Sequence, residues 1–430
     1  MASDSVAGTP SQCARTLSDA GQKTEGENVS TISSRRGPTK ASAGLIVVTC
    51  ALSAALALAA PPLQPPQHAR YSLEVLGTLD GTPCGRPSPP GSCTGGTFGE
   101  AHGLNDRGAT AGQSLLMSNS LPLHAFFWQK GVMTDLGTLG GPDSLVNVAN
   151  HTLNETNTVV GLSETSTLDP GGEDWCGLGT GLICLPFIWH NGAMTALPTL
   201  GGNNGQALGI NNRGQVVGQA ETPNLDPCSP FAQETKPVIW QHGVVQEVLS
   251  TLGGTAAVAN AINDDGDAVG ISGCNPTFYA VLWRHGAPTN LGSLGGTVGL
   301  IAIPFDINNR GQIVGQSDLP GDIVHHAFLW QGGVMTDLGT LSAELPTSQA
   351  DGINNRGQVV GFSDNDAIGD ASAVAVLWEN GTIVDLNSVI PVGSPLFLME
   401  AVSINDRGEI AGWGRLANGD HRPFLLIPYK

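Results

Sequence analysis

The residues that could do chemistry in this chain of 430 residues are its 10 histidines, 8 cysteines and 37 acidic residues. They form no catalytic motif, because the sequence lacks the hydrolase elbow Gly-x-Ser-x-Gly, the metal motif His-Glu-x-x-His, a Walker loop and a dinucleotide fingerprint. His124 and His326 recur in equivalent segments, which indicates a structural role, whereas His102, His151 and His190 are scattered. The sequence therefore predicts no catalytic residue.

The strongest metal candidate is the acidic run Asp364-Asn365-Asp366 together with Asp370, since alternating carboxylates can chelate Ca²⁺ through oxygen. Residues 263–267 are similarly acidic, but they occupy a hairpin turn and lack the full spacing of a calcium loop. We therefore predict neither a bound metal nor another cofactor.

Six cysteines follow residue 60, an even number that suits an oxidising compartment. Closeness in sequence pairs the first with the second and the third with the fourth, each inside one loop, and leaves the last two to link separate loops. Free thiols at these last two positions remain the alternative, and none of the six forms a CxxC pair. In chain order they are Cys84, Cys93, Cys176, Cys184, Cys228 and Cys274.

The composition indicates what kind of scaffold must position these residues. The chain has 59 Gly and 28 Pro but only 13% charged residues, which favours short strands and tight turns. The net charge of −19 argues against a nucleic-acid partner, because neutralising phosphates requires clustered Lys and Arg.

The N-terminal region has the order of an export signal. Residues 1–42 are polar and are predicted to be disordered. Residues 43–60 are apolar, follow the basic pair Arg35-Arg36 and end in Ala-Leu-Ala, as in a signal peptide or an uncleaved anchor. A twin-arginine signal is an alternative. Residues 61–70 form a Pro-rich spacer, and everything after it is expected to be extracellular, periplasmic or held at the cell surface.

The exported part contains seven copies of one segment, which makes a repeat architecture the first hypothesis. A length near 50 residues fits four strands and their turns, or one propeller blade. An asparagine opens the first turn of each copy, and these structural turn residues are Asn105, Asn154, Asn211, Asn263, Asn308, Asn354 and Asn405.

Each part of the copy predicts one element, as the third copy shows. Residues 207–210 are small and apolar, as suits an innermost strand, and 215–218 form the second strand. The turn between them, 211–214, needs Asn for local hydrogen bonds and Gly for a positive φ; in the second copy Asn157 stands at the Gly position. The outermost strand is predicted over equivalents of residues 133–139.

A tryptophan closes the third strand in six copies, and the seventh has Leu426 instead. Regular repetition among apolar neighbours indicates a core layer between blades rather than a sugar-stacking platform, and burying each indole is worth roughly 3 kcal/mol. These core residues are Trp128, Trp189, Trp240, Trp283, Trp330 and Trp378.

The ends of the repeat region predict how the ring closes. Residues 71–79 resemble an outermost strand without its blade, and the last copy stops after its third strand at 423–427. Pairing the two would remove an open sheet edge. The fold predicted for residues 71–430 is therefore all-β, a seven-bladed β-propeller of four-stranded blades closed by the N-terminal strand.

The segments HAFFWQKGVMTDLGTLGG at 124–141 and HAFLWQGGVMTDLGTL at 326–341 resemble the HAF-type bacterial extracellular repeat. The resemblance covers about 360 residues, and five copies depart from His-Ala-Phe. It implies export and a repeat-built β fold, and it brings no established activity.

Loop lengths indicate where a ligand would bind. The connections between the second and third strands vary, whereas the turns between the first and second strands and between the third and fourth are short, so the variable surface lies on one face. We expect a monomeric, non-catalytic binding or scaffold protein for an unknown extracellular glycan, peptide or cell-surface component. The alternative is a propeller hydrolase or lyase whose acids come from several blades, so enzymatic activity stays open.

Overall fold

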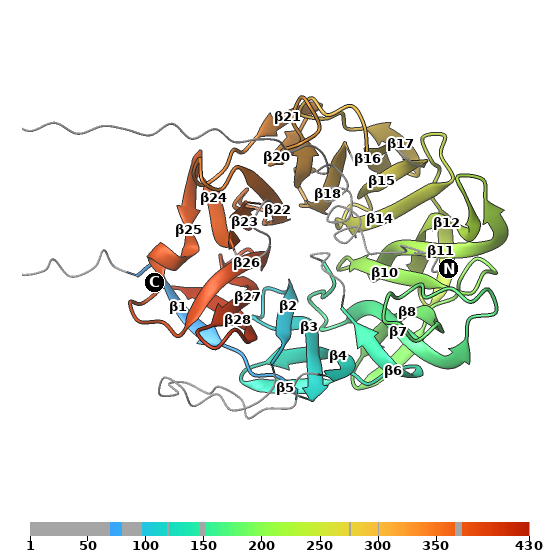
Figure 1. Cartoon of the computed structure of the whole chain (residues 1–430), viewed down its shortest axis with the longest axis horizontal. Helices are drawn as coiled ribbons and strands as arrows, with labels where there is room; N and C mark the ends of the chain where they lie inside the picture. The colour runs from blue at the N-terminus through green and yellow to red at the C-terminus, as the bar shows by residue number, and fades with distance from the viewer. Residues whose placement is uncertain are drawn as a thin grey trace, which may run out of the picture.

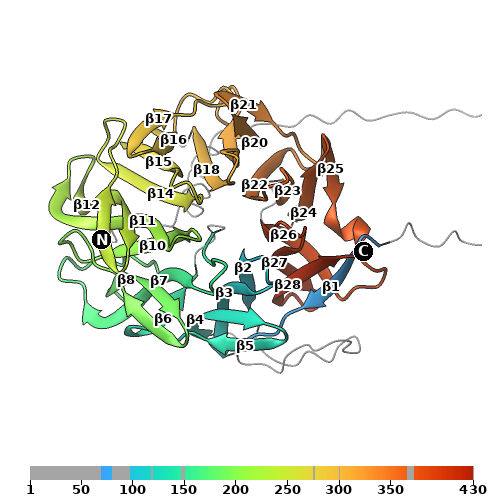
Figure 2. The same cartoon turned by 180° about the vertical axis from the view of Figure 1, so that it is seen from behind.

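The computed structural model describes residues 69–79, 97–117, 120–146, 151–274, 277–299, 301–365 and 372–429. They form 28 strands in seven four-stranded sheets. The sheets stand as blades around one axis (Figure 1), and Figure 2 shows the ring from behind. The predicted seven-bladed β-propeller is confirmed.

We number the blades 1 to 7 in chain order, and each runs from the axis to the rim. The innermost strands are β2 (Gly99–Leu104), β6 (Gly140–Leu145), β10 (Gly205–Ile210), β14 (Ala256–Ile262), β18 (Ala302–Ile307), β22 (Thr347–Ile353) and β26 (Leu396–Ile404). The second strands are β3 (Thr110–Met117), β7 (Val159–Leu168), β11 (Gln215–Asp226), β15 (Ala268–Cys274), β19 (Ile313–Asp318), β23 (Val359–Asp364) and β27 (Ile410–Leu416).

The third strands are β4 (Ser120–Gln129), β8 (Leu182–His190), β12 (Ser229–Gln241), β16 (Thr277–Arg284), β20 (His325–Gln331), β24 (Val374–Glu379) and β28 (His421–Pro428). The outermost strands are β5 (Val132–Asp135), β9 (Ala193–Ala196), β13 (Val244–Val248), β17 (Ala287–Asn290), β21 (Val334–Asp337), β25 (Thr382–Asp385) and β1 (Tyr71–Val75). A short 3₁₀ helix, η3 (Leu386–Val389), follows β25.

Because neighbouring strands are antiparallel, the connections fall on two faces. The turn face carries the connections between first and second and between third and fourth strands. The loop face carries the connections between second and third strands and those that lead to the next blade.

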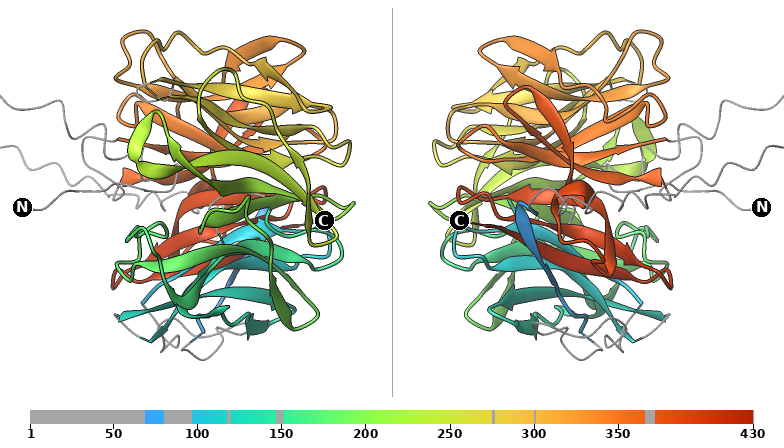
Figure 3. Two further views of the ribbon diagram at one scale, coloured as in Figure 1. Left: turned by 90° about the vertical axis from the view of Figure 1, so that its right-hand side faces the viewer. Right: turned by 90° about the vertical axis from the view of Figure 1, so that its left-hand side faces the viewer.

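The N-terminal strand closes the ring. β1 pairs with β28 from Tyr71 opposite Pro428 to Val75 opposite Phe424. In the right-hand view of Figure 3, β1 lies along the last blade, beside strands from the other end of the chain. The edge of β28 is therefore covered, and the last blade has four strands like the other six.

The outermost strand is shorter than predicted. It was expected over 133–139, but β5 ends at Asp135. The carboxylate of Asp135 accepts the Gly137 N–H at 2.8 Å and pairs with His124 Nδ1 at 2.8 Å, so the chain turns away here. His326 and Asp337 make the same contact in blade 5, which explains why His-Ala-Phe and Thr-Asp-Leu-Gly occur together.

A bulge interrupts the innermost strand, and in blade 2 it is enlarged. In blade 3 the shift leaves one extra residue, Leu208, between paired positions. In blade 2, Leu145 pairs with Leu162 and Leu153 with Val159, so the chain has seven residues between the two pairs on the inner side and only two on the other. This extension brings His151 to the axis of the ring.

The tryptophans lie between blades. Each packs on the preceding blade: Trp128 contacts Ala411 and Leu425 of blade 7, while Trp240 joins Val160 and Leu197. All six are at most 8% exposed. The indole N–H of Trp240 donates to the carbonyl of Pro198 at 2.8 Å.

Residues 1–68 lie outside the described residues, including the predicted disordered region, the export segment and most of the spacer. Within the described ranges, no helix has the length and apolar composition needed to cross a membrane.

Deleting residues 71–79 is expected to expose the edge of β28 and to convert a monomer into aggregates, since unpaired edges recruit other strands. Size-exclusion chromatography checks this, with deletion of the spacer residues 61–68 as the control. A monomeric protein with an unchanged melting temperature after the first deletion would show that closure does not depend on β1.

Candidate functional site

The asparagine that opens each turn is held by its own loop. In blade 3, Asn211 Oδ1 accepts the N–H groups of Arg213 and Gln215 at 3.0 Å each, and Gly214 closes the turn with a φ of +75°. Asn157 takes the Gly position of blade 2 with a φ of +59°. These bonds explain why the turn needs Asn first and a residue tolerant of positive φ fourth.

The same asparagines also join neighbouring blades. Each Nδ2 donates to the backbone carbonyl of the equivalent asparagine in the next blade at 2.9 to 3.2 Å, and Asn405 donates to Asn105 to complete the circle. Sequence reasoning predicted the local bonds and missed this circle. The sequence feature that could have revealed the circle is the presence of Asn in all seven copies. Asp would accept the local hydrogen bonds equally well, but its side chain has no N–H to donate.

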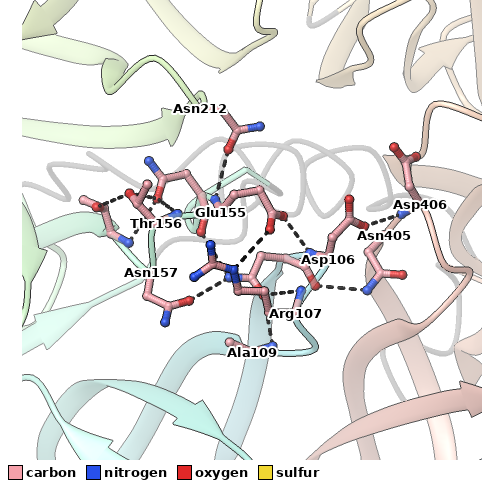
Figure 4. Close-up of polar contacts among 12 residues, drawn as sticks. Asp106, Arg107, Ala109, Glu155, Thr156, Asn157, Asn212, Asn405 and Asp406 are labelled. Atoms are coloured by element: carbon pink, nitrogen blue, oxygen red, sulfur yellow. Dashed lines mark hydrogen bonds and ion pairs between the residues drawn. The ribbon is translucent and has the colours of Figure 1, made fainter.

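The residue after each asparagine forms a second circle. Its backbone N–H donates to the side-chain oxygen of its equivalent in the next blade at 2.6 to 3.0 Å, and Figure 4 shows part of both circles. Its members are Asp106, Glu155, Asn212, Asp264, Asn309, Asn355 and Asp406.

These two circles surround a cavity of about 100 Å³ on the axis of the turn face, which we call the central cavity. Four carboxylates of the second circle line it, and His151, brought in by the blade 2 extension, is the sole histidine among its lining residues. Among the residues that the structure describes, no arginine or lysine lines it.

Across the axis, His151 meets Asp306 of blade 5. His151 Nδ1 lies 2.9 Å from Asp306 Oδ1, and the Asp306 carboxylate also accepts the N–H groups of Ile307 and Ile353 at 2.7 and 2.8 Å. Burial opposes the charge of His151, but the Asp306 carboxylate outweighs it and raises the pKa of His151. Sequence reasoning classed His151 as scattered, because nothing local marks a contact between blades 2 and 5.

The loop face holds the disulfides. Cys176 bonds to Cys184 inside the blade 2 loop, and Cys228 bonds to Cys274 between blades 3 and 4, with Cα atoms 6.1 and 5.6 Å apart. Both predicted pairs are confirmed, and the second depended on the assignment of faces. The predicted pair of Cys84 and Cys93 lies outside the described residues.

Asn204 anchors the long blade 2 loop to blade 3. Its Oδ1 accepts the Cys184 N–H, and its Nδ2 donates to Asp169 Oδ2, both at 2.9 Å. Its backbone N–H donates to Glu221 Oε2 at 2.7 Å. Burial, with the nearby charge of Glu173, raises the pKa of Glu221 to about 7.

A buried polar cluster lies between blades 7 and 1. Glu100 sits 3.6 Å from both His102 Nε2 and His421 Nδ1, and His421 stacks on Trp413. Burial acts against ionisation of Glu100, but the two histidines overcome it and lower its pKa to about 2. In blade 6, burial together with the charge of Glu400 raises the pKa of Asp351 well above its usual range.

The metal candidate is only partly described. The Asp364 carboxylate accepts the hydroxyl of Thr347, and the Asn365 N–H donates to Ser372 Oγ at 2.9 Å, while Asp366 and Asp370 lie outside the described residues. Within the described residues, no group of three His, Cys, Asp or Glu could hold a metal ion.

The residues singled out from the sequence therefore lie in three different parts of the structure. Six of the seven turn asparagines line the central cavity, the four described cysteines brace the loop face, and the tryptophans lie between blades.

Replacing Asn211 with Ala is expected to lower the free energy of unfolding by about 1–3 kcal/mol, because buried backbone groups lose their partners. Asn211→Asp keeps the local acceptors but lacks the N–H that reaches Asn263 at 2.9 Å, so it isolates the bond between blades. Urea unfolding of both variants checks this. If Asn211→Asp matches the wild type, the circle does not contribute to stability.

Glu221 is expected to make the protein less stable as pH rises. Its folded pKa of about 7 exceeds the ordinary 4.5, so the folded state holds the proton more tightly and stability is lost between pH 4.5 and 7. Glu221→Gln should remove about 1–3 kcal/mol of that loss in urea unfolding across this range. Glu234→Gln is the control, because the ion pair with Lys236 lowers the pKa of Glu234 instead of raising it. Identical pH profiles of wild type and Glu221→Gln would contradict this.

Comparison with known proteins finds no matching family model and no matching curated protein. Among solved structures, an acylaminoacyl peptidase from Pyrococcus horikoshii matches at 10% identity over 76% of this chain and 51% of its own, with a TM-score of 0.45. A Trypanosoma rangeli sialidase in complex with the inhibitor DANA matches at 9% identity (82% and 58% coverage; TM-score 0.38), and the polysaccharide lyase Uly1 at 9% (84% and 98%; 0.39). The chain thus spans about half the length of the peptidase.

Proposed function

We propose that this protein is an exported binding propeller that holds an extracellular glycan or peptide on its loop face. The observation that carries the proposal is the braced wall formed by blades 2 to 4. There the β11–β12 hairpin is the longest strand pair of the described blades. The bond from Cys228 to Cys274 ties its tip to blade 4, and the bond from Cys176 to Cys184 braces the loop of blade 2.

Exposed apolar side chains on this wall provide contact area for a ligand. Leu168 ends β7 and Leu225 lies near the tip of the β11–β12 hairpin, and they are 70% and 67% exposed. Tyr279 of blade 4 is exposed as well. A rigid surface that keeps such side chains in water is typical of a binding site, since ordering the loops beforehand lowers the entropic cost of binding.

Export is supported by the two disulfides, which persist in oxidising compartments, and by the apolar segment at 43–60. The resemblance of the repeats to the HAF-type extracellular repeat fits the same location. The acidic net charge favours neutral or cationic ligands over polyanions.

A second candidate is a hydrolase or lyase, favoured by the acidic pair in blades 6 and 7. Burial, with the nearby charge of Glu400, raises the pKa of Asp351 and favours its protonated form, and acid–base cleavage of a glycosidic bond requires such a proton donor. Asp351 is 2% exposed, so a substrate would have to displace the side chains that cover it.

Screening the wild-type protein against glycan and peptide arrays tests the first candidate. The double variant Leu168→Ser/Leu225→Ser should weaken a specific hit by about thirtyfold, because two apolar contacts of roughly 1 kcal/mol each are lost. The matched control is Val132→Ser/Val244→Ser, which removes equally exposed valines from the turn face and should change affinity less than twofold.

The same screen separates the two candidates. Chain cleavage of an arrayed polysaccharide by the wild type, abolished in Asp351→Asn, would replace binding with catalysis. Absence of any specific ligand, or equal losses in the two double variants, would overturn the assignment of the loop face.

A further inference from the structure

The central cavity lies on the turn face, opposite the surface considered above, and its geometry is that of a small-molecule site. A water molecule needs roughly 10–15 Å³ measured in the same way, so about 100 Å³ holds several waters or a compact molecule of about five to eight non-hydrogen atoms. The cavity is too small for a polymer segment.

Acidic side chains line the central cavity. Asp106, Glu155, Asp264 and Asp406 stand around it, and the hydrogen-bond circle holds each in place. Asp106 Oδ2 makes no hydrogen bond to described residues, and Glu155 Oε2 lies 4.0 Å from Arg107 Nε, beyond hydrogen-bond distance, so this side of the rim offers carboxylate oxygens to a donor. An ammonium group would be attracted to them.

His151 supplies the opposite chemistry. Its Nδ1 is engaged by Asp306, a carboxylate that is itself 2% exposed and fixed by two backbone N–H groups. The pair orients the imidazole, while a third of the His151 side chain stays accessible, and Nε2 makes no hydrogen bond to described residues. A protonated Nε2 donates to an anionic or carbonyl oxygen.

We propose that the central cavity binds a small zwitterion of the amino-acid class, with its carboxylate on His151 and its ammonium group at Asp106 and Glu155. The size of the cavity limits the ligand, the acidic rim selects its cationic end, and the His151–Asp306 pair receives its anionic end. This site is separate from the proposed loop-face function and does not depend on it.

Ligand-observed NMR on the full propeller tests this with three probes, alanine, ethylammonium and acetate. Alanine should bind at least tenfold more tightly than either of the other probes. Alanine carries both charges, whereas ethylammonium carries only the positive charge and acetate only the negative one. Equal affinity for ethylammonium would overturn the role of His151, and binding of acetate alone would overturn the role of the rim. Failure of all three to bind would overturn the site.

Two variants probe the two ends. Glu155→Gln keeps an oxygen for the Asp106 N–H but removes the charge, and His151→Gln removes the imidazole; each should weaken alanine binding about tenfold. Asp265→Asn is the matched control, since this exposed neighbour of Asp264 carries the same charge on the same face and does not line the cavity.

Thermal unfolding of each variant separates loss of the ligand from loss of the fold. If His151→Gln unfolds because Asp306 loses its partner, Glu155→Gln still decides the proposal, because its hydrogen bond is retained. If Asp265→Asn loses as much affinity as Glu155→Gln, the binding depends only on the overall negative charge of the turn face. That result would overturn the site.

Discussion

The ring depends on an amide that donates and accepts at once. Each turn asparagine uses its oxygen to shape its own hairpin and its nitrogen to hold the carbonyl of the next. Because the bond from Asn405 returns to Asn105, no blade is terminal on this face, and each hairpin is fixed relative to two others. Such a closed circle is cooperative, since loosening one turn removes a partner from its neighbour.

The two faces therefore carry different constraints. Turns on the polar circles cannot change length without breaking bonds to both neighbours. Connections on the loop face are not part of such a hydrogen-bond circle, so their lengths can vary. They range from the tight β15–β16 hairpin to the Asp169–Gly181 loop, which a disulfide and Asn204 hold in place. Between the faces, the tryptophan layer supplies apolar burial that does not depend on either.

The fold was predictable because its determinants are local and repeated. A turn asparagine, a third-strand tryptophan and complementary chain ends each specify one element, and seven copies specify the ring. The bridge between Cys228 and Cys274 followed from the same strand order. The outermost strand was predicted too long because alternation of residue types continues past Asp135, while the bond from Gly137 to its carboxylate ends the strand.

The central cavity was not predictable, because its residues come together only after closure. His151 and Asp306 are 155 positions apart in the sequence, in blades that are not neighbours, and neither stands in a motif. The acids of the rim occupy ordinary turn positions, where Asp and Asn are expected for local reasons. Long-range pairing of this kind leaves no periodic trace in a single sequence.

The extension of blade 2 has a consequence for recognition. A ring with seven identical turns would offer a ligand on its axis seven equivalent orientations, and the bound molecule could rotate among them. His151, whose imidazole reaches Asp306 across the axis, singles out one direction. Choosing one of seven orientations is equivalent to about 1.1 kcal/mol of orientational free energy, and this asymmetry lets a pseudo-symmetric scaffold tell one end of a molecule from the other.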